Sequence, residues 1–462
     1  MPVPEPADAS ARALAALQRD GTDAVSFQAL KAGTHWWQDR PPPEGSGGLV
    51  AYVPSGRSWI AIGTPLAAPA RRAAAVQRFC AAARAEHRRA VFLGVEDRAP
   101  VAGCRTLLLG LQPILRPAHW HLSVRQRPRL REQLRRARAK GVTVRAVPSD
   151  ALAAGTPLRA AVERLRREWL DSRAMEPLAF LVAVEPFHAA DAHRYVVAEH
   201  GGQPVQFLSA VPIAARQGWL LEDMLRGRRA PNGTTELLID ALMRDLGGDP
   251  AWVTPGLTPL TGPIRWWLRL TRWATVALYD FSGLQRFRAR LHPAAWTPVW
   301  MAWDRGTAPG VLLDVLRAFA AGRLIRFATR SLVWHPNGPP WAVAVPLVAW
   351  TALLFALVAS GRAGLLGYST AALAAWVAFD VVLAWLLFAV ARRPRPWPLA
   401  GAAAVALFDA VLSLAHLARV GVGGGLPALL RLTASAGPVI GTSALAWAAW
   451  RARARRPAAA WR

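Results

Sequence analysis

Four apolar segments in the last third of the chain constrain its fold more than any other feature. They cover residues 341–360, 367–391, 399–419 and 433–450. Each approaches the roughly 20 residues that an α-helix needs to cross the hydrocarbon core of a bilayer. The chain before residue 341 mixes polar and apolar positions as a water-soluble protein does. We therefore expect a soluble α/β (α+β) part followed by a bundle of about four transmembrane helices.

The arginines that flank these segments predict the orientation of the bundle. Basic residues are dense before the first segment, in the second loop and after the last segment, whereas Arg362 is the only one in the first loop. Positively charged loops tend to stay in the cytoplasm. We therefore expect a multi-pass protein of the bacterial inner membrane whose soluble part and C-terminus are both cytoplasmic. The N-terminal residues show no apolar core of a signal peptide.

Three ionisable residues fall inside the predicted spans, namely Asp380, Asp409 and His416. Such residues are costly in a bilayer, which makes them candidates for a transport or substrate-path role. Asp409 and His416 are seven residues apart and share one helix face. Polar pairing between buried helices explains them equally well, so the sequence leaves both interpretations open.

The net charge of +27 points to a polyanionic partner, either a nucleic acid or an anionic lipid surface. Arginine carries almost all of this charge, because Lys31 and Lys140 are the only lysines. The two cysteines, Cys80 and Cys104, fit no metal-binding motif and no disulfide framework. We therefore predict no metal.

The soluble part reads as two α/β units with the same order of elements. Residues 48–96 and residues 194–257 each predict strands, then a helix, then a strand. Tryptophan and arginine alternate through residues 262–335, which suits the bilayer interface as well as ordinary packing. The predicted divisions are a lead-in (1–24), a first domain (25–120), a second, catalytic domain (121–305), a basic interfacial linker (306–340), the membrane helices (341–450) and a basic cytoplasmic tail (451–462).

A strongly basic helix is predicted between residues 123 and 141. Pro128 suits its first turn and Gly141 suits its C-terminal stop. Eight cations stand against the single acid Glu132, and this self-repulsion favours a polyanionic partner over a plain solvated face. The predicted contacts with tRNA phosphates or phospholipid headgroups are Arg131, Arg135, Arg136, Arg138 and Lys140.

The stretch from Glu222 to Asp240 carries the candidate chemistry. A strand ends in Glu222 and Asp223, a basic turn follows, and Pro231 to Thr234 opens a helix. A helix N-terminus directs free N–H groups and a positive dipole end at an anionic ligand. Glu222 and Asp223 are the candidate catalytic residues, and a structural salt bridge is the alternative for the pair. Strand alternation predicts that one faces the site and the other faces away.

Further residues around this stretch are candidates for substrate binding. Arg226 is suited to a phosphate, and the helix start is suited to a developing oxyanion. Glu236 either contacts substrate or simply complements the helix dipole. His188 and His193 are predicted to lie at the surface. The predicted substrate-binding set is Arg173, Arg226, Asn232, Gly233, Thr234, Glu236 and Thr254.

Several motifs, taken in order, resemble one known family. They are RSWIAIGTPL, FLGVE, REQLRRARAKGV, EDMLRGRRAPNGTTELLIDALM, VTPGLTPLTG and LYDFSGLQRFRARLHPAAW. The resemblance that they carry covers roughly residues 20–305. They resemble the DUF2156 family, whose best-known relatives are the bacterial phosphatidylglycerol lysyltransferases. The resemblance implies two tandem GNAT-like acyltransferase folds. It also implies transfer of an aminoacyl group from aminoacyl-tRNA to phosphatidylglycerol or another membrane lipid, without a further cofactor.

Two departures from the family leave the donor and the acceptor open. In the lysyltransferases a flippase domain precedes the synthase, whereas here the apolar segments follow it. Where those enzymes resemble D-L-M-R, this chain has Glu222-Asp223-Met224-Leu225, with the arginine displaced to Arg226. A CoA-dependent acyltransferase is the main alternative, although Pro231 stands where its pyrophosphate loop has a glycine. A non-enzymatic membrane scaffold is the third hypothesis.

Overall fold

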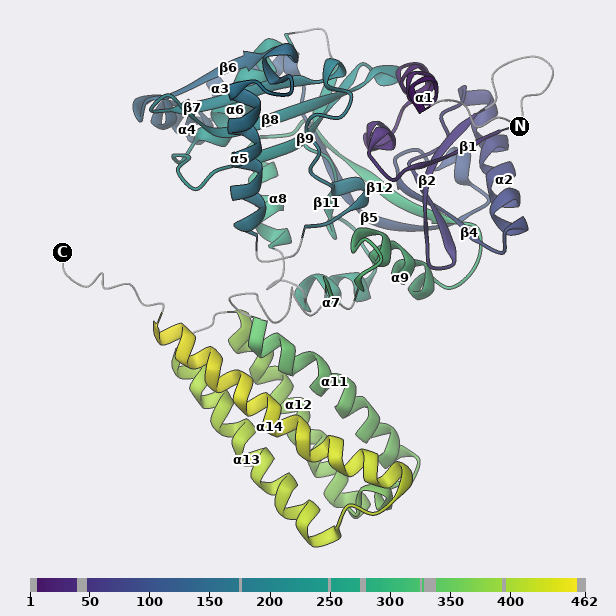
Figure 1. The fold of residues 1–462 in the computed structure, drawn as a ribbon, viewed down its shortest axis with the longest axis vertical. Coiled ribbons are helices and arrows are strands. Elements are labelled where there is room, and N and C mark those ends of the chain that lie inside the picture. The colour runs from purple at the N-terminus through teal and green to yellow at the C-terminus, as the bar shows by residue number, and fades with distance from the viewer. Residues whose placement is uncertain are drawn as a thin grey trace. The chain divides into compact units, whose positions relative to one another are not determined.

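The computed structural model describes residues 6–39, 48–173, 177–247, 251–274, 280–324, 326–327, 338–392 and 396–454. It divides the chain into two compact units, which are described separately (Figure 1). The N-terminal unit holds most of residues 1–324, and the C-terminal unit holds most of residues 325–462.

The first sheet of the N-terminal unit has seven strands in the order β1-β2-β3-β4-β12-β5-β11. Only β3 and β4 are parallel neighbours, and α2 (Pro69–Ala85) makes the crossover between them. Val76, Phe79 and Ala83 of this helix are buried against the sheet. The strands are β1 (His35–Gln38), β2 (Leu49–Ser55), β3 (Ser58–Ile62), β4 (Arg89–Val95), β5 (Arg105–Ile114), β11 (Thr258–Pro259) and β12 (Ala295–Trp303).

The second sheet has five strands in the order β10-β9-β8-β7-β6. Its parallel pair is β9 and β10, joined by α6 (Thr234–Asp245). On one face, α6 packs with α4 (Pro128–Ala139), and α5 (Pro157–Asp171) packs on the other. The strands are β6 (Val142–Val147), β7 (Arg194–His200), β8 (Gln203–Ile213), β9 (Gly218–Arg226) and β10 (Trp252–Thr254). Both sheets therefore contain the strand–helix–strand crossover that the sequence predicts.

Two late strands correct the predicted boundary between the domains. β12 lies between β4 and β5 in antiparallel register, with Met301 opposite Leu93 and Leu107, and β11 pairs with β5. Residues after 120 thus complete the first sheet, because β4 and β5 pair with β12 rather than with each other. The division at residue 120 is wrong as a separation between the two sheets.

The remaining helices of the N-terminal unit pack around the sheets. Val311 and Val315 of α9 (Ala308–Phe319) are buried with Leu107 of the first sheet. Residues 306–324 therefore belong to this unit and not to a linker. The other elements used below are α1 (Pro6–Asp20), η1 (Ser26–Leu30), α3 (Trp120–Gln126), η5 (Phe180–Val182), α7 (Trp266–Ala274) and α8 (Phe281–Arg290).

The C-terminal unit is a bundle of long helices: α11 (Gly338–Ala359), α12 (Thr370–Arg392), α13 (Pro396–Val420) and α14 (Gly425–Ala454). All four contribute to one core, represented by Ala344, Leu383, Ala406 and Leu445. The predicted spans 399–419 and 433–450 fall within α13 and α14, whereas 341–360 ends one residue beyond α11 and 367–391 begins three residues before α12. By length and composition, Thr370–Ala391 and Trp397–Val420 could cross a membrane, and the apolar part of α11, Val343–Ala359, is shorter. Residues 455–462 of the predicted tail lie outside the described residues.

The ionisable residues of the bundle have polar or aromatic neighbours within it. Asp380 and Asp409 are buried, and Asp409 accepts a hydrogen bond from Ser413. The His416 ring stacks on Tyr368 with 3.7 Å between ring centroids. These contacts are compatible with buried pairing, and a transport role for the three residues stays a prediction.

Candidate active site

A β-bulge in the second sheet places Glu222 and Asp223 on the same face. Leu208 pairs with Met224 and Ala210 pairs with Leu221, so Ser209 alone stands opposite both acids. Leu221 and Met224 both pack into the α6 side of the sheet. The two residues between them therefore project from the opposite side. The predicted alternation is wrong here, because it assumes a regular strand.

Glu222 and Asp223 lie just beyond the point at which β9 stops pairing with β10. β9 pairs with β10 only from Gly218 to Leu220, and Leu220 is opposite Thr254. Divergence at the carboxyl ends of parallel strands is a common place for a ligand site. Thr254 is fully buried, and its Oγ1 accepts a hydrogen bond from the N–H of Gly256 at 3.0 Å. Its observed contact is therefore structural.

Four side chains from distant segments converge on the Glu222 carboxylate, of which only 4% is exposed. Lys31 Nζ forms an ion pair with Oε1 at 3.0 Å, and Oε1 accepts a hydrogen bond from Gln28 Nε2 at 3.2 Å. Oε2 lies 3.2 Å from His193 Nε2, and His188 Nε2 is 3.9 Å from Oε1. We call the set Gln28, Lys31, His188, His193, Glu222 and Asp223 the Glu222 cluster.

The cluster gives its two acids different protonation behaviour. Burial alone would raise the pKa of Glu222, but the hydrogen bond from His193 and the charge of Lys31 outweigh it and lower that pKa to about 2. Burial, together with the neighbouring charge of Glu222, raises the pKa of Asp223 to about 7. Such separation of two adjacent carboxyls is typical of an acid–base site. Within the described residues, Asp223 Oδ2 is buried and has no hydrogen-bond partner.

The two histidines were missed by the sequence interpretation, which placed them at the surface. His193 is buried, with Nδ1 near the Ala189 carbonyl and Nε2 near Glu222, so donation to both acceptors requires the imidazolium form. Burial lowers the pKa of His188, whose Nδ1 contacts the Glu185 carbonyl. Phe27 packs against both rings.

One sequence signal could have located the cluster. Lys31 is one of two lysines in a chain with 56 basic residues, so a lysine at this position is itself unusual. Its ammonium is buried and also donates to the carbonyls of Ala183 and Leu181. A lysine presents a compact ammonium with three donors, and here it makes two hydrogen bonds to carbonyls and an ion pair with Glu222.

The same residues have the composition of a metal site. The ligand atoms of His188, His193 and Glu222 all lie within 4.8 Å of one another. However, the Lys31 ammonium already lies 3.0 Å from Glu222 and would repel a divalent ion at this position. The hydrogen-bonded arrangement accounts for the cluster without an ion, and the absence of a metal stays a prediction.

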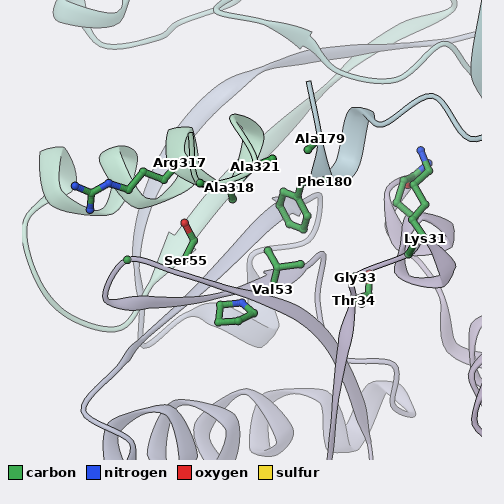
Figure 2. Close-up of a pocket in the computed structure, with 15 residues that line it drawn as sticks. Lys31, Gly33, Thr34, Val53, Ser55, Ala179, Phe180, Arg317, Ala318 and Ala321 are labelled. Carbon is green, nitrogen blue, oxygen red and sulfur yellow. The ribbon is translucent and has the colours of Figure 1, made fainter. Parts of the chain in front are cut away.

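A pocket of about 580 Å³ adjoins the Glu222 cluster and shares Gln28 and Lys31 with it. Figure 2 shows Lys31 on one side of Phe180, and Arg317 and Ala318 on the other. Val53 adds to the apolar wall. Neither aspartate nor glutamate is among the described residues that line the pocket. It therefore suits a ligand with an apolar part and a neutral or anionic part.

The helix start that the sequence singled out is a separate place. Arg226 lies four residues beyond Glu222, about 13 Å along an extended strand, and donates to the carbonyls of Ala230 and Pro231. Gly233 has φ +92°, and a Cβ there would lie 2.3 Å from the Gln133 carbonyl oxygen of α4. The N-terminus of α6 is thus covered by α4.

The other predicted substrate-binding residues have structural surroundings. Thr234 is fully buried and its hydroxyl donates to the Pro231 carbonyl, whereas Asn232 is exposed. Glu236 is half-buried in the first turn of α6. The Arg173 guanidinium lies over the Trp169 ring at 4.1 Å. Substrate binding by these residues stays a prediction.

The predicted basic helix is α4, and its cations are exposed. Leu130, Leu134 and Ala137 anchor it in the core. Arg135 and Arg136 pair with Glu132, and Arg138 pairs with Asp240. Arg131 and Lys140 are exposed on the same helix or at its end. The surface is strongly cationic, and its binding of phosphate stays a prediction.

Comparison with known proteins identifies the family. The model of a family described as "Phosphatidylglycerol lysyltransferase, C-terminal" matches residues 14–303, which include the whole Glu222 cluster. The chain belongs to this family. The recognition of DUF2156 from the motifs is confirmed, and the family is one of acyltransferases.

Two solved structures are similar to the N-terminal unit. One is the C-terminal DUF2156 domain of a proposed lysylphosphatidylglycerol synthetase from Agrobacterium fabrum, with 22% identity, a TM-score of 0.57, and coverage of 68% of this chain and 98% of that chain. The other is L-PGS from Bacillus licheniformis, with 18% identity, a TM-score of 0.58, and coverage of 69% and 97%. The fold is GNAT-like α/β, as the resemblance implied. No protein with a curated description matches this chain.

Proposed function

We propose that this protein is a membrane-anchored transferase that moves an aminoacyl group from aminoacyl-tRNA to a hydroxyl of phosphatidylglycerol or another membrane lipid. Membership of the family supports the reaction class. The observation that carries the proposal is the Glu222 cluster. Burial and the adjacent Glu222 charge raise the pKa of its Asp223 carboxyl, whereas His193 and Lys31 lower that of Glu222, and the adjoining pocket has no acid among its described lining residues.

Aminoacyl transfer requires one proton to move twice. The ionised Asp223 accepts the proton of the lipid hydroxyl while that oxygen attacks the ester carbonyl carbon of the aminoacyl group. The carbonyl oxygen gains negative charge, which the positive charges of Lys31 and His193 stabilise through space. When the bond to the tRNA 3′ oxygen breaks, the protonated Asp223 returns the proton to that oxygen. Glu222 remains ionised throughout and keeps Lys31 and His193 in place.

The proposed anchor is the helical bundle, with four spanning helices and both the N-terminal unit and the C-terminus in the cytoplasm. Large apolar side chains on the outside of the bundle support this arrangement. Phe355, Trp385, Phe408 and Ile440, one from each helix, are all exposed. A bundle with an apolar exterior is stable in lipid, whereas in water it would expose a large apolar surface that promotes aggregation.

The CoA-dependent alternative is disfavoured by the start of α6. In that reading the helix N-terminus would bind the pyrophosphate. Pro231 lacks an N–H, and α4 packs directly against Gly233. The same α4 is the surface that we propose for tRNA. An inactive scaffold with this fold is distinguished from an enzyme by the following assay.

The test uses the purified full chain in detergent, vesicles of phosphatidylglycerol or of extracted membrane lipids, and a mixture of tRNAs charged with labelled amino acids. We expect labelled aminoacyl-lipid to form and free tRNA to be released in equal amounts. Acyl-CoA donors are tested in parallel. The proposal fails if no charged tRNA yields a labelled lipid, and a product formed from acyl-CoA would establish the alternative.

The role of α4 has its own measurement. Replacing both Arg135 and Arg136 by alanine should weaken tRNA binding and reduce the slope of log K against log salt by about one for each arginine. Arg105→Ala is the matched control, because Arg105 is an exposed arginine on the first sheet. Equal binding and equal slopes for both variants would remove α4 from the tRNA interface.

A further inference from the structure

An exposed apolar surface lies on the outside of α7 and α9. Trp266 is 70% exposed, Leu316 54% and Leu313 39%. The inner sides of the two helices share one core, in which Leu268 of α7 and Val311 of α9 both take part. The two helices therefore pack on the same part of the N-terminal unit, as Figure 1 shows. We call Arg265, Trp266, Arg269, Leu313, Leu316 and Arg323 the α7–α9 face.

The charge on this face has one sign. Arg265, Arg269 and Arg323 are exposed. The sequences of α7 and α9 contain a single acid, Asp314, which is buried and pairs with Arg89 at 2.6 Å. Tryptophan and leucine surrounded by arginine match the interface of an anionic bilayer, where apolar side chains enter the headgroup boundary and guanidinium groups meet phosphates.

The other side of α9 faces the pocket. Ala318 and Ala321, at the C-terminal end of α9 and just beyond it, line the pocket together with Phe180, whose ring contacts Phe319. Lys31, on the far side of Phe180 in Figure 2, belongs to the Glu222 cluster. One helix therefore separates the exposed face from a pocket that leads toward the candidate catalytic carboxyls.

We propose that the α7–α9 face docks on the headgroup layer of an anionic phospholipid bilayer, and that the pocket behind α9 is the entrance for the headgroup of the lipid acceptor. The entrance rests on the proposed function, whereas the docking does not. The arginines favour a bilayer over a second copy of the chain, since two such faces would repel each other. A bilayer is also the surface that the long apolar helices of the same chain are suited to reach.

Docking is measured on the full chain in vesicles made from equal parts of phosphatidylcholine and phosphatidylglycerol. Cys80 and Cys104 are first replaced by alanine, and a nitroxide label is attached at Leu316→Cys. Leu122→Cys is the matched control, because Leu122 is an exposed leucine, 42% accessible, on α3. Relaxation of the label by oxygen and by a water-soluble nickel complex reports the depth of each position.

We expect the label at 316 to be reached by oxygen and shielded from nickel, while the label at 122 is reached by nickel. The shielding should weaken when phosphatidylcholine replaces phosphatidylglycerol. Nickel access at 316 equal to that at 122 overturns the proposal. A label at 316 that neither reagent reaches also overturns it, because protein then covers the face.

The entrance is tested by activity. Combining Leu313→Glu with Leu316→Glu should raise the KM for vesicle phosphatidylglycerol by about tenfold or more, with kcat on a dispersed short-chain phosphatidylglycerol unchanged. An unchanged KM on vesicles, or an equal loss on both lipids, overturns the entrance. If wild-type protein modifies no lipid at all, the proposed function and the entrance fail together, and the label depths still decide whether the face docks.

Discussion

Replacing Asp223 by asparagine tests the acid–base role of the Glu222 cluster most directly. The amide has the same size and still allows the Asp223 N–H to donate to Ser209 Oγ, but it cannot accept a proton. General acid–base catalysis typically contributes about 10²–10⁴-fold. We expect kcat for aminoacyl-lipid formation to fall by that amount, with little change in the KM for tRNA.

The pH dependence gives the second part of this prediction. With the pKa of Asp223 raised to about 7, the ionised fraction rises from about 0.1 at pH 6 to about 0.9 at pH 8. The wild-type rate should therefore increase about tenfold over this interval. The Asp223→Asn rate should be flat. Initial rates are measured with labelled aminoacyl-tRNA after subtraction of spontaneous ester hydrolysis.

Stability separates this chemical role from a structural one. A carboxyl whose pKa is higher in the folded protein than in the unfolded chain loses folding free energy as the pH rises from about 4 to about 7. Asp223→Asn removes this loss and should raise the melting temperature at pH 8, while activity falls. Asp171→Asn, an exposed carboxyl on α5, is the control for both readouts. An Asp223→Asn protein with wild-type rate and pH profile would refute the reasoning.

Three further predictions concern stability. Lys31→Met leaves the buried Glu222 carboxylate without its ammonium partner and should lower the unfolding free energy in urea by about 3–5 kcal/mol. Adding Glu222→Gln should restore most of this loss. A double variant no more stable than Lys31→Met would contradict the pairing. Because the pKa of Glu222 is lowered to about 2, the stability that Glu222 contributes should be lost as the pH falls from about 5 toward 2. Glu222→Gln should reduce this loss. Parallel curves of unfolding free energy against pH for the wild type and the variant would contradict the prediction. Gly233→Ala brings a Cβ within 2.3 Å of the Gln133 carbonyl oxygen at a positive φ, so it should lower the unfolding free energy by more than about 2 kcal/mol. Gly103→Ala is the control, because Gly103 has open space around it, and it should change the unfolding free energy by less than about 0.5 kcal/mol. Similar values for the two variants would show that α6 does not need this close approach.

Local patterns were sufficient to predict the crossover from β9 through α6 to β10. The apolar run before Glu222, the turn residues and the helical spacing after Thr234 all act over a few residues. The same holds for α4, where Pro128 and Gly141 fix both ends. The sequence also identified Glu222 and Asp223 as a candidate pair, because they follow an apolar run and precede a basic turn.

The arrangement around these acids depends on partners far away in the sequence. The bulge arises because Ser209 lies opposite two residues, and nothing in the local pattern of β9 marks it. His193 and Lys31 meet at Glu222 from positions 29 and 191 residues away. The local pattern therefore favours a helix start rich in donors, whereas the structure brings the charged side chains together in the middle of β9.

The position of β12 has a consequence for biosynthesis. The second sheet is complete once the ribosome has made Thr254, but the first sheet waits for Ala295–Trp303. Until that segment emerges, β4 and β5 present open edges, which are prone to wrong pairing. The nascent chain therefore closes its first sheet only shortly before α11, its first long apolar helix, is synthesised. Folding of the N-terminal unit and insertion of the bundle then fall in the same short interval. A delay in either would leave open strand edges and apolar helices exposed to aggregation at the same time.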